Sequence, residues 1–244
     1  MKGLIPAAGK GTRLEPITLA IPKELLMVGD KAVIEHVIEA MKIVGIEEIA
    51  IVVGWRKHAI LDYLGSGERL GVKLIYVVQD RRDGLAKAVA AGEQVIGNES
   101  FLVVLGDNFF YPKTFLKNIM EFHNRVDADA TIGVAEVEDP TRHGMIKPGG
   151  NHRIIDIVEK PSLEKSPSNL GCMGVYVFKP VIFDSIRKTK PGVKDEYQLT
   201  DSIKILIDKG YKVFYQKIEG QHIDVGTIED FKKANLFFSK VHDE

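Results

Sequence analysis

The sequence of 244 residues contains one cysteine, Cys172, and therefore cannot form an internal disulfide. Small secreted domains commonly depend on disulfides, so this absence favours a cytoplasmic protein. A lone cysteine is most often a small, buried apolar side chain, and we expect no redox role for Cys172.

The sequence also lacks a long apolar run and an excess of charge of one sign. No segment approaches the ~20 apolar residues that a membrane-spanning helix needs. Met1 and Lys2 lead directly into a strand pattern, which is not how a signal peptide begins. With 33 basic and 34 acidic residues the net charge is −1, so no overall field attracts nucleic acid or anionic lipid. We therefore expect neither a nucleic acid nor a membrane as a partner.

The composition that remains is that of an ordinary globular protein, with 45% hydrophobic and 27% charged residues. Apolar strand patterns alternate with helical periodicity through the first half of the chain. The predicted strands are 4–8, 49–54, 73–79 and 101–107, and the predicted helices are 33–44, 58–64 and 85–97. Fully apolar strands that alternate with helices predict an α/β fold with a Rossmann-like, mostly parallel sheet flanked by helices.

The second half of the chain is richer in strand patterns. These are ATIGVAEV, GMIKP, RIIDIVEKP, GVYVFKP, KVFYQKIEG and HIDVG, with helices starting at Val181 and Leu199 and a last helix from Ile228 to about Val241. We interpret them as a continuation of the sheet plus an added β-rich lobe. We expect a single domain over residues 1–244, with a boundary near residue 110 between its two halves.

The opening segment, LIPAAGKGTRLEPITLAIPKELL at residues 4–26, carries the clearest chemical signal. A short apolar strand ends in Gly9, Gly11 and Thr12, and two cations follow at Arg13 and Lys23. The free backbone N–H groups of such a loop can bind an anion, and glycine lets a ligand approach the backbone closely. The cations indicate that this anion is a polyphosphate.

Two common phosphate-binding motifs do not fit this segment. The P-loop requires GKS or GKT, and neither tripeptide occurs in the chain. The dinucleotide-binding pattern GxGxxG fails because Leu14 stands where its third glycine belongs. A nicotinamide-dependent oxidoreductase is therefore not favoured.

The pattern GxGTRL followed by PK resembles the signature of sugar-1-phosphate nucleotidyltransferases. Further motifs follow in the order that this family uses: YVVQDRRDGLAKAV, VVLGDNFF, EDPTRHGMI, IVEKP, SNLGCMGVYVF, DEYQLTD and HIDVGT. Taken together they are most similar to glucose-1-phosphate thymidylyltransferases. The resemblance implies a nucleotide-binding half at about residues 1–110 and a sugar-binding half at about 111–244. It also implies nucleotide-sugar biosynthesis, as used in making polysaccharides, with a nucleoside triphosphate and a sugar 1-phosphate as substrates.

Three cations have catalytic roles by this resemblance. Arg13 would bind the outer phosphates of the triphosphate, Lys23 the α-phosphate and the sugar phosphate, and Lys160 the sugar phosphate. The chemistry needs them, because a phosphate dianion must attack a polyanion and pyrophosphate must leave. Asp107 and Asp224 would together hold Mg²⁺, which accepts one or two carboxylates and completes its shell with phosphates and water.

The remaining site residues follow from the same resemblance. Ala7, Ala8, Gly9, Gly11, Thr12 and Asp107 would line the nucleotide. Gln79 and Gly84 would bind the base, because a glutamine amide offers the donor and acceptor that match the edge of uracil or thymine. Each of these positions also has a purely structural alternative, a turn or the end of a strand.

Glu159, Lys160, Gly144 and the backbone at Cys172 would surround the hexose. Neighbours on a strand point to opposite faces, so Glu159 and Lys160 reach one ligand only if Pro161 or a bulge bends the strand. The alternative is an edge strand stopped by Pro161, with both charges in solvent. No histidine, serine or cysteine nucleophile is required, because a sugar phosphate with a second pKa of ~6 is mostly dianionic at neutral pH.

The choice of nucleotide stays open at this point. Ala8 and Pro22 stand where thymidylyltransferases usually carry glycine and serine, and these departures resemble uridylyltransferases. LGDN and DPTRHG resemble the thymidylyl group, so we expect dTTP and glucose 1-phosphate to give dTDP-glucose, with UTP as the alternative. A non-catalytic nucleotide-sugar sensor is the alternative of another class. The resemblance further implies a homo-oligomer, a dimer or tetramer, and the chain shows no hexapeptide-repeat acetyltransferase extension.

Overall fold

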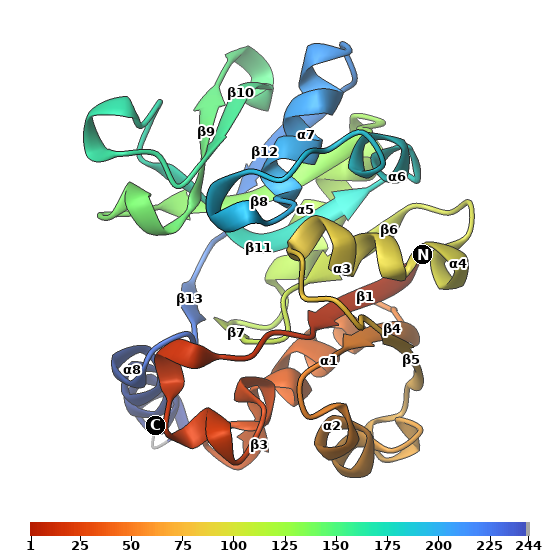
Figure 1. Ribbon diagram of the computed structural model, residues 1–244, viewed down its shortest axis with the longest axis vertical. Coiled ribbons are helices and arrows are strands. Elements are labelled where there is room, and N and C mark those ends of the chain that lie inside the picture. Colours follow the sequence, from red (N-terminus) through yellow and green to blue (C-terminus); the bar gives the residue numbers. More distant parts are fainter. Residues whose placement is uncertain (243–244) are drawn as a thin grey trace.

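The computed structural model describes residues 1–242 of the chain. Within these residues, a mixed sheet of nine strands forms the centre of the fold (Figure 1). Its strands are β1 (Lys2–Ala7), β4 (Glu48–Val53), β5 (Lys73–Val78), β6 (Phe101–Val104), β8 (Ala130–Glu136), β9 (Gly144–Pro148), β10 (Ile154–Glu159), β11 (Leu170–Phe178) and β12 (Val213–Lys217). Their order is β10, β9, β11, β6, β1, β4, β5, and β8 joins β11 to β12.

Eight α-helices, besides short 3-10 helices, accompany the strands within residues 1–242. They are α1 (Val33–Ile43), α2 (Lys57–Leu64), α3 (Leu85–Ala91), α4 (Glu93–Ile96), α5 (Phe115–Arg125), α6 (Val181–Ile186), α7 (Leu199–Asp208) and α8 (Ile228–His242). None of these helices is both long enough and apolar enough to cross a lipid bilayer.

Strands β6, β1, β4 and β5 run parallel to one another, as the alternating pattern predicts. Side chains that are neighbours on β1 point to opposite faces of the sheet. Leu4 belongs to the apolar cluster that includes Val89 of α3, whereas Ile5 belongs to the cluster that includes Val37 of α1. Helices therefore cover both faces, which is why β1, β4 and β6 are mostly apolar and buried, whereas β5 at the edge of the sheet is only partly buried.

Beyond residue 110 the sheet continues with strands of both directions. Strand β11 is antiparallel to β6 and β8, and β12 is parallel to β8. At Gly174, where φ is 68°, β11 bends, and Gly171 lies opposite Met145 of β9. A Cβ atom at Gly174 would lie 2.5 Å from the amide nitrogen of Asn108, so this bend requires glycine. The antiparallel pair β9 and β10, with α7 packed on β10, forms the added lobe.

A second, smaller sheet joins the middle of the chain to its end. Strand β7 (Asn108–Tyr111) pairs antiparallel with β13 (Gln221–Asp224), and α8 follows β13. Helix α8 packs beside the N-terminal segment, which includes the short strands β2 (Met27–Val28) and β3 (Lys31–Ala32) (Figure 1). The end of the described chain therefore packs against the segment that follows β1.

Two details of the prediction are wrong. The single helix expected over residues 85–97 is divided at Gly92 into α3 and α4. A Cβ atom at Gly92 would lie 2.4 Å from a methyl carbon of Leu4, so glycine lets the chain approach β1 closely there. The strand expected over 101–107 ends at Val104, and residues from Asn108 onward turn away to form β7.

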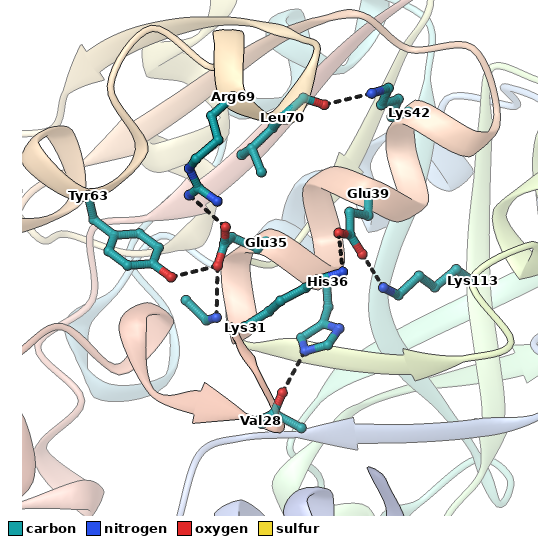
Figure 2. Close-up of polar contacts among 11 residues, drawn as sticks. Val28, Lys31, Glu35, His36, Glu39, Lys42, Tyr63, Arg69, Leu70 and Lys113 are labelled. Carbon is teal, nitrogen blue, oxygen red and sulfur yellow. Dashed lines mark hydrogen bonds and ion pairs between the residues drawn. The ribbon is translucent and has the colours of Figure 1, made fainter. Parts of the chain in front are cut away.

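Helix α1 is attached to its surroundings by two carboxylates, the buried Glu35 and the partly buried Glu39 (Figure 2). The Glu35 carboxylate accepts hydrogen bonds from the backbone N–H of Ala32 (3.0 Å) and the hydroxyl of Tyr63 (2.7 Å). It also forms an ion pair of 2.7 Å with Arg69. One turn later, Glu39 pairs with Lys31 and Lys113 (Figure 2). These contacts link α1 to α2 and to the segment that precedes α5.

Candidate active site

The carboxyl ends of the parallel strands open into two adjoining hollows. One, of about 490 Å³, lies at the ends of β1 and β5, and the other, of about 670 Å³, extends to β9, β10 and β11. Leu85, Leu105, Asp107 and Glu196 line both hollows, so the two are parts of one cleft. Ligands of open α/β sheets bind at this edge.

The glycine-rich loop forms one wall of the first hollow. Ala8, Gly9, Gly11 and Thr12 line it, and Gly11 has a left-handed φ of 67°. The carbonyl of Gly11 accepts a hydrogen bond of 2.8 Å from the Thr18 hydroxyl, which fixes the turn. Ala7, in contrast, is buried in an apolar cluster, and in the structure of residues 1–242 it lines neither hollow.

Lys23 lies in this hollow beside carboxylates. Its ammonium group donates a hydrogen bond to Asp107, and a Cβ atom at Gly9 would lie 3.5 Å from Lys23 Cε. Burial by itself lowers the pKa of Lys23, but the charges of Asp107, Glu24 and Asp224 outweigh this effect and hold the pKa above its usual value. The lysine is therefore a permanent cation pointing at the phosphate loop.

Asp224 reaches Asp107 through the pairing of β13 with β7. Asp224 lies opposite Asn108, and the next backbone N–H, of Val225, donates to the carbonyl of Asp107 at 2.9 Å. Burial, together with the nearby Asp107 charge, raises the pKa of Asp224 to about 6, against the effect of Lys23 and Arg13. Its Oδ1 atom is buried and has no hydrogen-bond partner in residues 1–242. An unpaired carboxylate oxygen of this kind is suited to a cation.

Arg13 is exposed and lines the second hollow together with Asp107 and Asp224. It lies in the short 3-10 helix Thr12–Leu14, which the fully buried Leu14 anchors to the core. The predicted phosphate-binding and metal-binding residues therefore converge on one place, although they come from four separate segments of the chain.

Gln79 lies at the end of β5 and is 9% exposed. Its amide nitrogen donates to the carboxylate of Asp83 (3.2 Å) and to the carbonyl of Gly84 (3.4 Å), which orients the amide in the first hollow. Gly84 has a φ of 117°, and a Cβ atom there would lie 2.4 Å from the carbonyl oxygen of Tyr197. Glycine at this position thus lets two loops meet at the wall of the hollow.

The four predicted sugar-side residues all line the second hollow. The Lys160 ammonium lies 2.7 Å from Oε1 of Glu159, and Oε2 of Glu159 accepts a hydrogen bond of 2.8 Å from the Thr200 hydroxyl. The bend that brings the two neighbours together is at Lys160 itself, which has a φ of 42°. A Cβ atom at Gly144 would lie 3.2 Å from Glu159 and 3.7 Å from the sulfur of Cys172.

A family profile described as nucleotidyl transferase matches residues 2–241, nearly the whole chain. The chain belongs to the nucleotidyl transferase family. The expected family and fold are thereby confirmed, and the protein is an enzyme of the nucleotidyltransferase type.

Curated relatives and solved structures agree with this membership. The transferase is 37% identical over 267 residues to a UTP–glucose-1-phosphate uridylyltransferase of Mycoplasma genitalium, covering 97% of this chain and 90% of that protein. It is 35% identical over 236 residues to a low-salt glycan biosynthesis nucleotidyltransferase of Haloferax volcanii, covering 96% of this chain but only 65% of that protein.

Two solved structures have the same fold. A UDP-glucose pyrophosphorylase complexed with UDP-glucose superposes with a TM-score of 0.92 at 32% identity, covering 98% of both chains. A putative glucose-1-phosphate thymidylyltransferase from Bacillus anthracis, in complex with a sucrose, gives 0.87 at 33% identity, covering 98% of this chain and 95% of that one.

The structure of the transferase also adds residues that the sequence motifs did not identify. Glu24, 1% exposed, lines the first hollow, and burial raises its pKa to about 7. Lys10 and Arg82 line the same hollow, and Thr200 orients Glu159 in the second. One feature of the sequence could have identified Glu24, because it is a charged residue between Lys23 and two leucines.

The donor set of the cleft suits a hard divalent cation held partly by substrate. In residues 1–242 no three His, Cys, Asp or Glu side chains form a metal-binding group. The carboxylates of Asp107 and Asp224 share the second hollow, and one Asp224 oxygen is unpaired. Mg²⁺ typically binds to one or two protein carboxylates and completes its coordination with phosphate and water. The two carboxylates of this cleft fit that pattern better than they fit a metal held by protein ligands alone.

Proposed function

We propose that the transferase joins a pyrimidine nucleoside triphosphate to glucose 1-phosphate, forming a nucleoside diphosphate glucose and releasing pyrophosphate. The observation that carries this proposal is the convergence of Arg13, Lys23, Asp107 and Asp224 where two hollows meet. Two adjoining hollows are suited to two substrates, one carrying a base and the other a sugar.

The relatives support glucose 1-phosphate and a pyrimidine nucleotide without agreeing on the base. The names of the uridylyltransferase and the UDP-glucose pyrophosphorylase favour UTP. The name of the Bacillus anthracis protein, together with the motifs LGDN and DPTRHG, favours dTTP. The amide of Gln79 matches the edge of both bases, so we propose both nucleotides as substrates to be compared directly.

The reaction needs no protein nucleophile. A phosphate oxygen of glucose 1-phosphate attacks the α-phosphorus of the triphosphate, one P–O bond forms, and the P–O bond to the β-phosphate breaks. The attacking phosphate is already deprotonated at neutral pH, so no side chain has to remove a proton. The protein contributes position and positive charge, which are the main contributions to phosphoryl-transfer catalysis.

Lys23 lines the first hollow and Lys160 the second, so the two lysines would approach the reacting phosphates from opposite substrates. Arg13, which lines the second hollow beside Asp107 and Asp224, would bind the outer phosphates of the triphosphate where the hollows meet. Bound Mg²⁺, held by Asp107 and Asp224, would neutralise charge on the triphosphate as the bond breaks. Glu159, oriented by Thr200, accepts hydrogen bonds from the hexose hydroxyls. This division assigns the phosphate to the lysine and the sugar ring to the glutamate.

One assay tests the proposal. Purified protein with Mg²⁺ is offered five nucleoside triphosphates and the 1-phosphates of glucose, galactose and mannose, and pyrophosphate release is measured with a coupled enzyme. We expect turnover with glucose 1-phosphate and UTP or dTTP, and loss of turnover when Mg²⁺ is removed by EDTA. No turnover with any pair would contradict the proposal and favour a non-catalytic nucleotide-sugar sensor.

The expected homo-oligomer and the cytoplasmic location stay predictions. Size-exclusion chromatography with light scattering tests the first, and cell fractionation tests the second.

A further inference from the structure

Trp55, the single tryptophan of the chain, lies where three cationic side chains meet. The ammonium nitrogen of Lys10 lies 5.4 Å from the ring centre, and the guanidinium carbons of Arg56 and Arg82 lie 5.6 and 5.7 Å from it. Cations at such distances are attracted by the negative face of the ring. They come from three different loops, which follow β1, β4 and β5.

The indole is attached to the glycine-rich loop from two sides. A Cβ atom at Gly54 would lie 2.9 Å from the carbonyl oxygen of Ala8, so glycine lets the end of β4 approach this loop. The backbone N–H of Trp55 donates to that carbonyl, and its indole N–H donates to the carbonyl of Thr18, both at 3.4 Å. Because the Thr18 hydroxyl donates to Gly11, the ring is connected to both ends of the loop.

Two of the three cations line the first hollow, the one at the ends of β1 and β5. Lys10 and Arg82 line it, whereas Trp55 does not. Arg56 is used elsewhere, because it donates to the carbonyl of Leu19. Within residues 1–242, the Trp55 ring is the one interaction partner that the structure gives Arg82, whose side chain is exposed.

The three neighbouring positive charges of Lys10, Arg56 and Arg82 favour the binding of an anion. Three cations around one ring repel one another, and Glu15, 4.0 Å from Lys10, is the one carboxylate paired with any of the three in residues 1–242. The net charge of the chain is −1, so the cluster is not part of a generally basic surface. An anionic group between the cations relieves their repulsion, and Lys10 lies in the loop between Gly9 and Gly11.

We propose that Arg82 and Lys10, held over the Trp55 ring, form a cationic clasp for the outer phosphates of the triphosphate and for pyrophosphate. Trp55 is a positioning residue in this clasp, because it keeps two loops in register without touching the ligand. The proposal rests on the proposed function for the identity of the ligand. It adds two cations to the first hollow besides Lys23, on a wall separate from Arg13, which lines the second hollow.

The first experiment is a binding titration that uses Trp55 as its own reporter. Because no other tryptophan is present, emission changes report this ring alone. We expect pyrophosphate and UTP to change the emission of the wild type. Arg82→Gln should raise the dissociation constants of both about tenfold, as expected for one lost charge-assisted contact, and leave that of UMP unchanged.

The matched control is the neighbouring arginine. Arg81 is exposed, and within residues 1–242 it lines neither hollow and is not among the cations over the Trp55 ring, so Arg81→Gln removes the same charge one position away. It should bind pyrophosphate like the wild type. Equal losses of pyrophosphate affinity in Arg81→Gln and Arg82→Gln would show that only the net charge matters, and would overturn the clasp. A weaker affinity for UMP in Arg82→Gln would make the residue a base or ribose contact and also overturn it.

Steady-state kinetics separate the positioning role of Trp55 from a general structural role. Trp55→Leu should raise KM for the triphosphate, with kcat and KM for the sugar phosphate unchanged, and Trp55→Phe should restore most of the affinity because it keeps an aromatic face. In a Lys10→Gln/Arg82→Gln background, Trp55→Leu should cause no further loss. A further rise in KM for the triphosphate in that background, or a lower kcat in Trp55→Leu alone, would contradict the proposal that Trp55 acts by positioning the two cations.

The two proposals fail in different ways. If the wild type turns over and Arg82→Gln equals Arg81→Gln, the clasp is wrong and the proposed function stands. If the wild type turns over with no substrate pair, the proposed function is wrong, and the pyrophosphate titrations still decide the clasp.

Discussion

The ammonium group of Lys23 donates a hydrogen bond to the carboxylate of Asp107, across 84 residues of sequence. In the proposed reaction these two groups serve different ligands, the phosphates and the metal. Here each neutralises the other inside a cleft where an unpaired charge is costly. Binding of Mg²⁺ and the triphosphate would exchange this contact for a metal–carboxylate contact and a lysine–phosphate contact.

Asp107→Asn and Asp224→Asn should each lower kcat/KM by a factor of about 10²–10³, the loss typical of one charge-stabilising group. The asparagine amide keeps the shape of the carboxylate but not its charge. Activity is measured over a range of Mg²⁺ concentrations, with the exposed Asp62→Asn as the matched control. Wild-type activity of either variant at limiting Mg²⁺ would show that this carboxylate does not hold the metal.

Gln79→Ala should weaken discrimination among nucleotides more than it lowers kcat. The amide contacts the base, which does not change between the ground state and the transition state, so it contributes uniform binding. Competition between UTP, dTTP and the purine triphosphates measures this effect. Unchanged selectivity would mean that the amide serves only its structural contacts with Asp83 and Gly84.

Glu159→Ala and Lys160→Ala should differ although the two side chains touch. Lys160→Ala should lower turnover with every sugar phosphate, because the lysine meets the attacking phosphate. Glu159→Ala should chiefly raise KM and reduce discrimination among hexoses, because a site that binds a hydroxyl group rejects analogues without it. Kinetics with glucose, galactose and mannose 1-phosphates decide, and identical losses in both variants would show that their roles are not divided.

Glu35→Ala should destabilise the fold by about 2 kcal/mol, because it leaves the buried backbone N–H of Ala32 without its acceptor and removes the contacts with Arg69 and Tyr63, which water replaces (Figure 2). Tyr63→Phe removes one of these hydrogen bonds and should cost about 1 kcal/mol. Urea unfolding measures both changes. Lys42→Ala, which removes one exposed contact with Leu70, is the control and should change stability little. Equal effects of the three variants would show that Glu35 does not hold α1 in place.

His123 should make the fold sensitive to acid. Burial, aided by the Lys179 charge, lowers the pKa of this histidine to about 4 in the folded protein. In the unfolded chain the pKa is about 6.5, so the unfolded state binds the proton first and stability is lost as the pH falls from about 6.5 towards 4. The loss attributable to His123 is about 3 kcal/mol over this window.

Urea unfolding at pH 7 and at pH 4.5 tests this expectation. His123→Asn keeps a partner for Thr131, which lies 3.0 Å from the ring nitrogen, but removes the titrating group. The difference in stability between the two pH values should therefore shrink in His123→Asn and stay the same in the exposed control His58→Asn. An unchanged difference in His123→Asn would assign the acid sensitivity to other groups.

Local patterns in the sequence predicted most of the parallel half of the fold and part of the site, but not the division of the helix at Gly92 or the end of β6 at Val104. Apolar runs followed by Gly9, Gln79 and Asp107 predicted that these residues share one edge, because parallel strands all end on the same side of a sheet. No helix was predicted over 115–125, although the signal was present, since Phe115, Leu116, Ile119 and Phe122 recur at helical spacing and are buried in α5.

Only the tertiary structure decided which distant residues meet. The pairing of β13 with β7 brings Asp224 to Asp107, and the left-handed backbone at Lys160 turns its side chain toward Glu159. The approach of β4 to the glycine-rich loop places the Trp55 ring within reach of both Lys10 and Arg82. Spacing along the chain encodes the period of a helix or strand and the point where it ends. It does not encode which strands pair or where loops cross, because those contacts depend on the packing of the whole core.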